Sequence, residues 1–200
     1  MTTISKCGSV LLTLLIAAAA GSCAAGSAPA RSPSSAARVT AGSDRPIPVI
    51  LAADEGERRT RRTLGGARLF VKVDPETARS PEFVMTMEAI PVGEAIPLHA
   101  HPSADEIIFI HRGSGRAQLD TRSSSVTEGA TIYIPRSTRV ALRNTGSQPL
   151  VIIAIFSQTG FESYLRDTSV PAGQPVVPLT PAQLRSVRSA HEHDIVFENP

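Results

Sequence analysis

Residues 93–113 read GEAIPLHAHPSADEIIFIHRG and place His99, His101 and Glu106 in a short window between two β-like runs. His99 and His101 are two residues apart, so on a strand both side chains leave from the same face. Residues 102–105 are typical of a turn, which brings Glu106 back beside the histidines. Two imidazoles and one carboxylate that converge in this way predict a divalent-metal site of the two-histidine, one-carboxylate kind.

The first residues of the chain predict an export signal that is not part of the fold. Residues 10–20 are an apolar run of about the length of a signal-peptide core, too short to span a membrane. Residues 20–23, AGSC, resemble the lipobox of bacterial lipoproteins, although alanine stands where leucine is usual. We therefore expect a lipoprotein signal peptide over residues 1–22 and a lipid on Cys23. The alternative is an ordinary signal peptide cleaved nearby, with Cys23 incidental.

The cysteine count and the charge agree with an exported, anchored protein. The chain has two cysteines, Cys7 and Cys23, of which the first would leave with the signal peptide and the second would be alkylated, so no disulfide is expected. Without residues 1–22 the chain keeps 19 basic and 18 acidic side chains. This near-neutral balance gives no reason to expect a nucleic-acid partner.

Composition divides the remaining chain into a tether and one domain. After the cysteine, residues 23–46 are mostly Ala, Ser, Gly and Pro without apolar periodicity, which predicts a flexible linker. Residues 47–200 are enough for one domain with a single core. We expect this domain to be held to the lipid bilayer of the bacterial cell envelope, on the periplasmic or outer side. Residues 58–62, RRTRR, are expected to be solvated, the alternative being contact with anionic lipid or an acidic partner.

Within the domain, apolar and polar residues alternate with a period of two. Gly, Pro, Asn and Ser clusters separate the runs, and no crossover helices interrupt them, which predicts an antiparallel all-β sandwich or barrel. Residues 113–115, GSG, lie between two runs and predict a hairpin turn. The runs that predict strands cover residues 68–73, 83–89, 107–110, 117–120, 131–134, 140–143 and 150–156.

One short helix is expected near the C-terminus. Thr180 is an N-cap candidate, Pro181 occupies the first helical position, and Gln183 completes a capping box. The helix is expected to cover a sheet edge or the barrel wall. His191 and His193 follow it and are interpreted as a solvated pair rather than as ligands.

On these residues the chain resembles the cupin superfamily of double-stranded β-helix, or jelly-roll, barrels. The spacing of Gly93, His99, His101, Glu106 and Gly113 satisfies the first cupin motif at every fixed position. Three segments outside the motifs resemble small single-domain cupins related to quercetin 2,3-dioxygenases. These segments are residues 53–59, 160–165 and 179–181.

The second cupin motif is only partly present. Gly129, Pro135 and Asn144 stand where the family has them, whereas Ser137 replaces a glycine and Val140 replaces a histidine. In the family, that histidine binds the metal together with the two histidines and the glutamate of the first motif. The resemblance therefore implies three metal ligands and an apolar side chain in place of the fourth.

Two other residues on the strand after the turn are placed by their spacing from Glu106. His111 is five residues further on, an odd offset that turns it to the opposite face, so it is interpreted as a surface or interface residue. Ile108 would share the face of Glu106 if the strand is regular and would make the metal pocket more apolar.

Two functions remain open at this point. His99, His101 and Glu106 would leave three open positions on an octahedral Fe, Mn, Ni or Zn ion, the arrangement used by non-haem Fe(II) oxygenases. The resemblance then implies a dioxygenase-like oxidoreductase acting on a small organic substrate, with no separate catalytic base identifiable. The alternative is a non-catalytic, metal-free cupin that binds a small molecule at the cell surface. A homodimer is expected from the resemblance alone.

Overall fold

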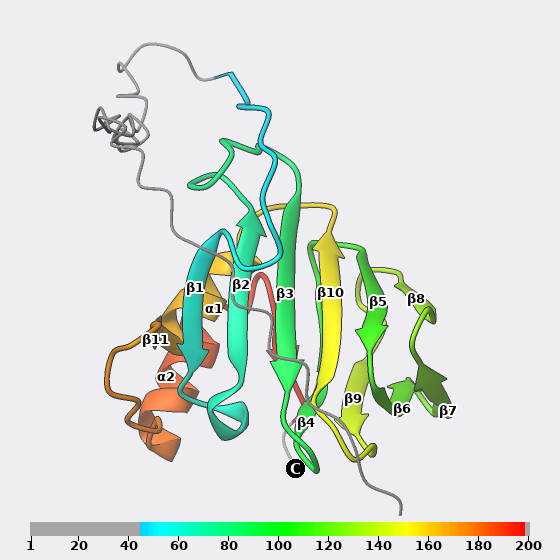
Figure 1. The fold of residues 1–200 in the computed structure, drawn as a ribbon. Helices are drawn as coiled ribbons and strands as arrows, with labels where there is room; N and C mark the ends of the chain where they lie inside the picture. The colour runs from blue at the N-terminus through cyan, green and yellow to red at the C-terminus, as the bar shows by residue number, and fades with distance from the viewer. Residues whose placement is uncertain (1–44, 199–200) are drawn as a thin grey trace, which may run out of the picture. The chain divides into compact units, whose positions relative to one another are not determined.

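The computed structural model describes residues 45–198, which form two antiparallel β-sheets with two helices beside them (Figure 1). The expected signal peptide, the Cys23 anchor and nearly all of the linker lie outside the described residues. None of the helices within residues 45–198 is long and apolar enough to cross a membrane.

The strands are short and follow one another closely along the chain. The larger sheet contains β1 (Glu57–Arg61), β2 (Arg68–Val73), β3 (Val84–Ile90), β5 (Glu106–Arg112), β8 (Thr131–Ile134), β10 (Leu150–Phe156) and β11 (Ser169–Pro171). The smaller sheet contains β4 (Ala95–Ala100), β6 (Ser114–Leu119), β7 (Arg122–Thr127), β9 (Val140–Asn144) and β12 (Val196–Phe197). The helices are α1 (Phe161–Asp167) and α2 (Pro181–Ala190), and a 3-10 turn spans Leu64–Gly66.

The strand order confirms the predicted jelly-roll architecture. The larger sheet runs β11-β1-β2-β3-β10-β5-β8 and the smaller sheet runs β12-β4-β9-β6-β7. Every pairing is antiparallel, and several neighbours in a sheet come from distant parts of the chain, as β10 does between β3 and β5. Between β3 and β10 the chain crosses repeatedly from one sheet to the other, as a double-stranded β-helix requires.

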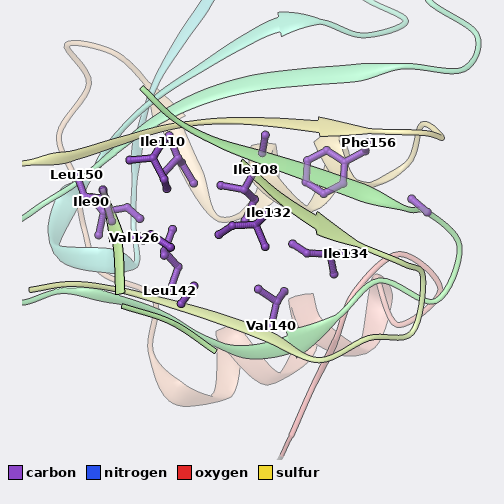
Figure 2. Packing of buried hydrophobic residues seen from close by; sticks show 14 of the residues in the cluster. Ile90, Ile108, Ile110, Val126, Ile132, Ile134, Val140, Leu142, Leu150 and Phe156 are labelled. Atoms are coloured by element: carbon purple, nitrogen blue, oxygen red, sulfur yellow. The ribbon is translucent and has the colours of Figure 1, made fainter. Parts of the chain in front are cut away.

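The hydrophobic core lies between the two sheets (Figure 2). Strand β5 shows how it forms, because Glu106, Ile108 and Ile110 are buried while Ile107 and Phe109 face outward. Strand β10 is apolar on both faces and lies inside its sheet, between β3 and β5. The labelled core side chains in Figure 2 are Ile90, Ile108, Ile110, Val126, Ile132, Ile134, Val140, Leu142, Leu150 and Phe156.

The hairpin predicted at residues 113–115 is wrong. Strands β5 and β6 belong to different sheets, and β6 pairs with β7 and β9, so this segment is a corner where the chain changes sheets. Gly113 has a φ of 93°, and a Cβ atom there would lie 2.9 Å from the Pro149 carbonyl oxygen. The corner therefore requires glycine for its conformation and for its close backbone approach.

The arginine-rich segment 58–62 is also not simply solvated. Most of it forms β1, which pairs with β2 on one side and with β11 on the other. The side chains of Arg59 and Arg61 are largely buried, and only Arg58 is well exposed. Side chains alternate between the two faces of a strand, so Arg59 and Arg61 lie on the same face, and this face is turned toward the protein interior.

The helical region contains one predicted and one unpredicted helix. Helix α2 begins as predicted, with the Thr180 hydroxyl accepting from the Gln183 amide at 3.3 Å and Gln183 accepting from the Thr180 amide. Helix α1 was missed, although Phe161, Tyr164 and Leu165 have helical spacing. Tyr164 and Leu165 pack in a second small core with Leu69 of β2 and with Ile195, and Phe161 contacts both cores.

The interpretation of the C-terminal histidines as a solvated pair is wrong for His191. Its side chain is 12% exposed, and its Nε2 atom lies 2.8 Å from the Asp167 carboxylate. It also contacts the edge of the Tyr164 ring. This contact ties the end of α2 to the end of α1.

Asp74 and Arg166 link the loop after β2 to α1. Asp74 is fully buried and accepts hydrogen bonds from the amide of Thr77 at 2.7 Å and from the Arg166 guanidinium at 2.5 Å. Burial by itself raises the pKa of Asp74, but these hydrogen bonds outweigh it and lower the pKa below 3.8. Arg166 also binds Glu57 of β1, so one guanidinium joins three segments.

An Asp74→Asn substitution is expected to destabilise the protein by about 1–3 kcal/mol at neutral pH, because it weakens a charge-assisted hydrogen bond. A carboxyl whose folded-state pKa is lowered contributes stability above its unfolded-state pKa and loses it as the pH falls. The difference between wild type and variant should therefore shrink between about pH 4 and pH 2. Urea unfolding at several pH values measures it, with Glu82→Gln as the exposed control. A difference that is the same at all pH values would contradict this account.

Candidate metal centre

The three predicted ligands come from both sheets. His99 lies near the end of β4, His101 follows that strand, and Glu106 begins β5 in the facing sheet. Residues 102–105 are thus a crossing between sheets, fixed by Asp105, whose amide donates to the Ser157 hydroxyl at 2.9 Å. One ligand atom from each of the three side chains lies within 4.8 Å of the others. The structure therefore brings together the three residues that the sequence singled out.

Backbone carbonyls orient both imidazole rings. The His99 Nδ1 atom lies 2.7 Å from the Pro97 carbonyl oxygen, and the His101 Nδ1 atom lies 2.8 Å from that of Asp194. A carbonyl oxygen only accepts, so each Nδ1 must carry the hydrogen and donate it. The Nε2 atom of each neutral ring then keeps its lone pair, which is the tautomer of a metal-binding histidine.

Burial keeps these imidazoles neutral at physiological pH. His99 and His101 are 6% and 2% exposed. Burial lowers the pKa of His99 to about 4, and the charge of Arg61 lowers it further, against the hydrogen bond to Pro97. Burial, followed by the neighbouring His99, lowers the pKa of His101 to about 3. Both Nε2 lone pairs are therefore available across the physiological range.

Glu106 faces His101 without a hydrogen bond. Burial raises the pKa of Glu106 to about 8. Its Oε2 atom lies 3.7 Å from the His101 Nε2 atom, and neither atom has a hydrogen-bond partner among the described residues. A lone pair that faces a buried carboxyl oxygen is unfavourable unless a proton or a cation lies between them. The donor set of two nitrogens and a carboxylate fits a divalent transition metal.

Val140 occupies the side of the site where the resemblance expects a fourth ligand. It is 1% exposed, and it lies opposite His99 in the register of β9 with β4. Figure 2 shows its side chain pointing into the space between the sheets. Within residues 45–198, the three predicted residues form the one cluster of at least three histidine, cysteine or acidic side chains with this spacing. No fourth histidine replaces the missing one there.

The three side chains line a pocket of about 200 Å³ in the barrel. Its walls are mainly apolar and include Ile96, Leu142 and Ile152. The His101 ring packs edge-on against Phe156 and Phe161, with ring centroids 5.0 and 4.6 Å away. This volume is below the roughly 300–1,000 Å³ of drug-sized pockets, so the pocket suits a small organic molecule.

Sequence reasoning missed the polar wall of this pocket. The predicted strand at residues 83–89 had two alternating sets of side chains, and both contained apolar residues. The structure turns Thr86 and Glu88 of β3 inward, together with Val84 and Ile90. Arg61, Tyr164 and Arg188 also line the pocket. Strand periodicity signals such an alternation, but it does not say which set is buried when both are partly apolar.

His111 and Ile108 lie where their spacing predicted. His111 is exposed on the outer face of β5, away from this pocket, and Ile108 shares the inner face with Glu106. His111 therefore provides a control for the proposed histidine ligands, because it is a surface histidine on the same strand as Glu106.

The sequence of the domain is similar to those of known cupin proteins. Residues 86–156 match a protein-family model described as a cupin domain, which spans β3 to β10 and includes all three proposed ligands. An uncharacterized protein of Methanocaldococcus jannaschii is 41% identical over 64 residues. That match covers 32% of this chain and about half (51%) of the relative.

Solved structures share the fold at low sequence identity. A protein described as a predicted oxalate decarboxylase from Thermotoga maritima has a TM-score of 0.50 and 17% identity, over 56% of this chain and 100% of its own. An RmlC-like cupin from Shewanella frigidimarina has a TM-score of 0.50 and 14% identity, over 59% of this chain and 97% of its own. With the two-sheet topology, these likenesses show that the chain shares the fold of these proteins, and residues 86–156 match a cupin domain.

Proposed function

We propose that the protein binds one divalent metal ion through His99, His101 and Glu106 and acts through it on a small organic molecule. The observation that carries this proposal is the pair of hydrogen bonds from Nδ1 to backbone carbonyls. They leave the Nε2 lone pairs free, and the Nε2 atom of His101 lies 3.7 Å from a buried Glu106 oxygen that has no hydrogen bond among the described residues. Such a preoriented donor set supports a metal site better than a satisfied polar cluster.

We propose a dioxygenase-like oxidoreductase reaction as the activity of this site. A bound metal would supply a Lewis acid that polarises the substrate or activates dioxygen, and Fe, Mn, Ni and Zn all suit these ligands. The two neutral histidines would hold the ion in place, and Phe156 and Phe161 would keep water away from it. Because burial raises the pKa of Glu106 to about 8, binding of the metal near neutral pH would displace a proton from this carboxyl group.

The second candidate is a metal-free cupin that binds a small molecule without turnover. Val140 favours it, because an apolar side chain replaces one ligand of the resembled family. The jelly-roll fold supports either role, so the metal content of the protein decides between the two.

A His99→Ala, His101→Ala double variant is expected to lower the bound metal from about one ion per chain to near zero, because one carboxylate alone holds a divalent ion weakly. Elemental analysis after dialysis of the purified protein measures this ratio. His111→Ala is the matched control and should keep the wild-type metal content, since its imidazole lies outside the pocket.

Equal metal content in the wild type and the double variant would contradict the metal site and favour the metal-free candidate. Oxygen consumption by metal-loaded protein with flavonols or diketones then tests the reaction. Uptake that requires the metal would support a dioxygenase-like activity, and its absence with a loaded site would favour binding without turnover.

We also propose that the protein is exported and anchored in the cell envelope by a lipid on Cys23. The proposal is supported by the apolar run and the AGSC sequence that precede a cysteine-free remainder of the chain. It would hold the domain against a membrane surface through the linker of residues 23–46.

A Cys23→Ser variant is expected to move from the membrane fraction to the soluble fraction, because a lipid-modified cysteine would be its attachment to the bilayer. Fractionation of cells followed by detergent phase partitioning measures the change, and Cys7→Ser is the control that should stay with the membrane. A Cys23→Ser protein that still partitions into detergent would rule out the lipid anchor.

A further inference from the structure

A second polar cluster lines the same pocket and has no role in metal binding. Its members, here called the arginine cluster, are Arg61 of β1, Glu88 of β3, Tyr164 of α1 and Arg188 of α2. Glu88 is separate from the ligand set, because Val84, four residues away along β3, shares a row with Phe156 and Glu106. Four residues of a strand extend about 13 Å.

Arg61, Glu88 and Tyr164 of the cluster are buried, Arg188 is half-buried, and several of their polar atoms have no hydrogen-bond partner among the described residues. Arg61 and Glu88 are 8% and 7% exposed. Their closest charged atoms, Arg61 Nε and Glu88 Oε1, lie 3.6 Å apart, which is too far for a hydrogen bond. Arg61 Nε and Nη1, Glu88 Oε1 and Arg188 Nε have no hydrogen-bond partner among the described residues. Arg61 Nη2 makes only a 3.5 Å contact with the Thr63 hydroxyl.

These orphan atoms are concentrated in one place. Within residues 45–198, every buried side-chain polar atom without a hydrogen bond belongs to a residue that lines this pocket. Two of them are the proposed metal-facing atoms of His101 and Glu106, and the others belong to the arginine cluster. Buried polar groups are almost always paired, so such a concentration indicates that both clusters meet a ligand.

The charge of the arginine cluster is positive. It contains two guanidinium groups and one carboxyl group, and burial raises the pKa of Glu88 against the opposing effect of Arg61. Burial also raises the pKa of Tyr164, while the charges of Arg61 and Arg188 act against that rise. Both guanidinium groups therefore lie close to the same tyrosine hydroxyl, and one carboxyl group does not balance them.

One aromatic ring connects the arginine cluster to the proposed metal ligands. The Phe197 ring lies 5.8 Å from the His99 ring and 5.8 Å from the Tyr164 ring, and the Arg188 Cζ atom lies 3.8 Å from its centroid. Arg61 is also close enough to influence the pKa of His99 electrostatically. Both clusters therefore face the same pocket, and one bound small molecule can lie between them.

We propose that the arginine cluster binds a carboxylate group of the substrate, with Arg61 as the main partner and Arg188 beside it. A planar guanidinium matches a carboxylate in two-point geometry when Nη2 donates together with either Nε or Nη1. In Arg61 both Nε and Nη1 lack a partner, and Nη2 has only its 3.5 Å contact with Thr63. The apolar walls and the volume of about 200 Å³ suit a small monocarboxylate with an apolar body. The substrate class is thus a small organic acid, and its orientation toward His99, His101 and Glu106 rests on the proposed function.

Binding of benzoate and of its uncharged isostere benzamide to the purified full chain, measured by calorimetry with and without Zn²⁺, tests this proposal. Wild-type protein should prefer benzoate by about tenfold or more, and Arg61→Gln should weaken benzoate binding by about ten- to a hundredfold while leaving benzamide unchanged. Arg58→Gln, an exposed arginine on the same strand, is the matched control and should behave as wild type.

The Arg61→Gln substitution leaves the Glu88 carboxyl buried without a partner, so this variant could fail to fold, and a second variant is needed. The double variant Arg61→Gln, Glu88→Gln removes both charges with little change in shape and should also lose the preference for benzoate. The proposal is overturned if benzoate and benzamide bind equally, if neither binds, or if the folded variants keep the preference. Benzoate that binds only with Zn²⁺ and is insensitive to Arg61→Gln overturns it as well.

The same measurements separate this proposal from the proposed function. A protein that binds no metal but prefers benzoate through Arg61 would support the carboxylate site and contradict the metal site. A protein that retains metal and shows no preference for benzoate would contradict the carboxylate site alone. Metal analysis of each arginine variant is expected to match wild type, because Arg61 contributes no ligand.

Discussion

The hydrogen bond from His101 Nδ1 to the Asp194 carbonyl oxygen connects the two parts of this structure. On one side it fixes the tautomer of a buried histidine and directs its Nε2 atom toward Glu106. On the other side it holds the segment after α2, which supplies Ile195 and Phe197 to the pocket wall. One backbone carbonyl thus sets both the chemistry of the proposed ligand and the closure of the cavity around it.

The pocket combines two requirements that conflict in a folded protein. Its apolar walls exclude water and stabilise the barrel, yet they also surround two groups of polar atoms whose hydrogen bonds are not satisfied within the described chain. Unpaired buried groups cost stability, so proteins keep them where a ligand compensates the loss. A metal at Glu106 and a carboxylate at Arg61 would satisfy the two groups by opposite charges, a cation at one and an anion at the other.

The sequence was sufficient to predict the cluster of His99, His101 and Glu106 because these residues lie close together in it. His99, His101 and Glu106 are confined to eight residues, and strand geometry with one chain crossing relates them. The arginine cluster could not be predicted in this way, since its members come from β1, β3, α1 and α2 and meet only through tertiary packing. The corner at Gly113 was misread for a related reason, because local turn signals do not reveal whether two strands share a sheet.

Anomalous diffraction from crystals of the metal-loaded protein tests the central claim most directly. The account predicts one strong peak about 2.0–2.3 Å from the Nε2 atoms of His99 and His101 and from a Glu106 carboxylate oxygen, with both Nδ1 atoms still donating to their carbonyls. A peak at another place in the protein, or imidazole rings that turn their Nδ1 atoms toward Glu106, would contradict it.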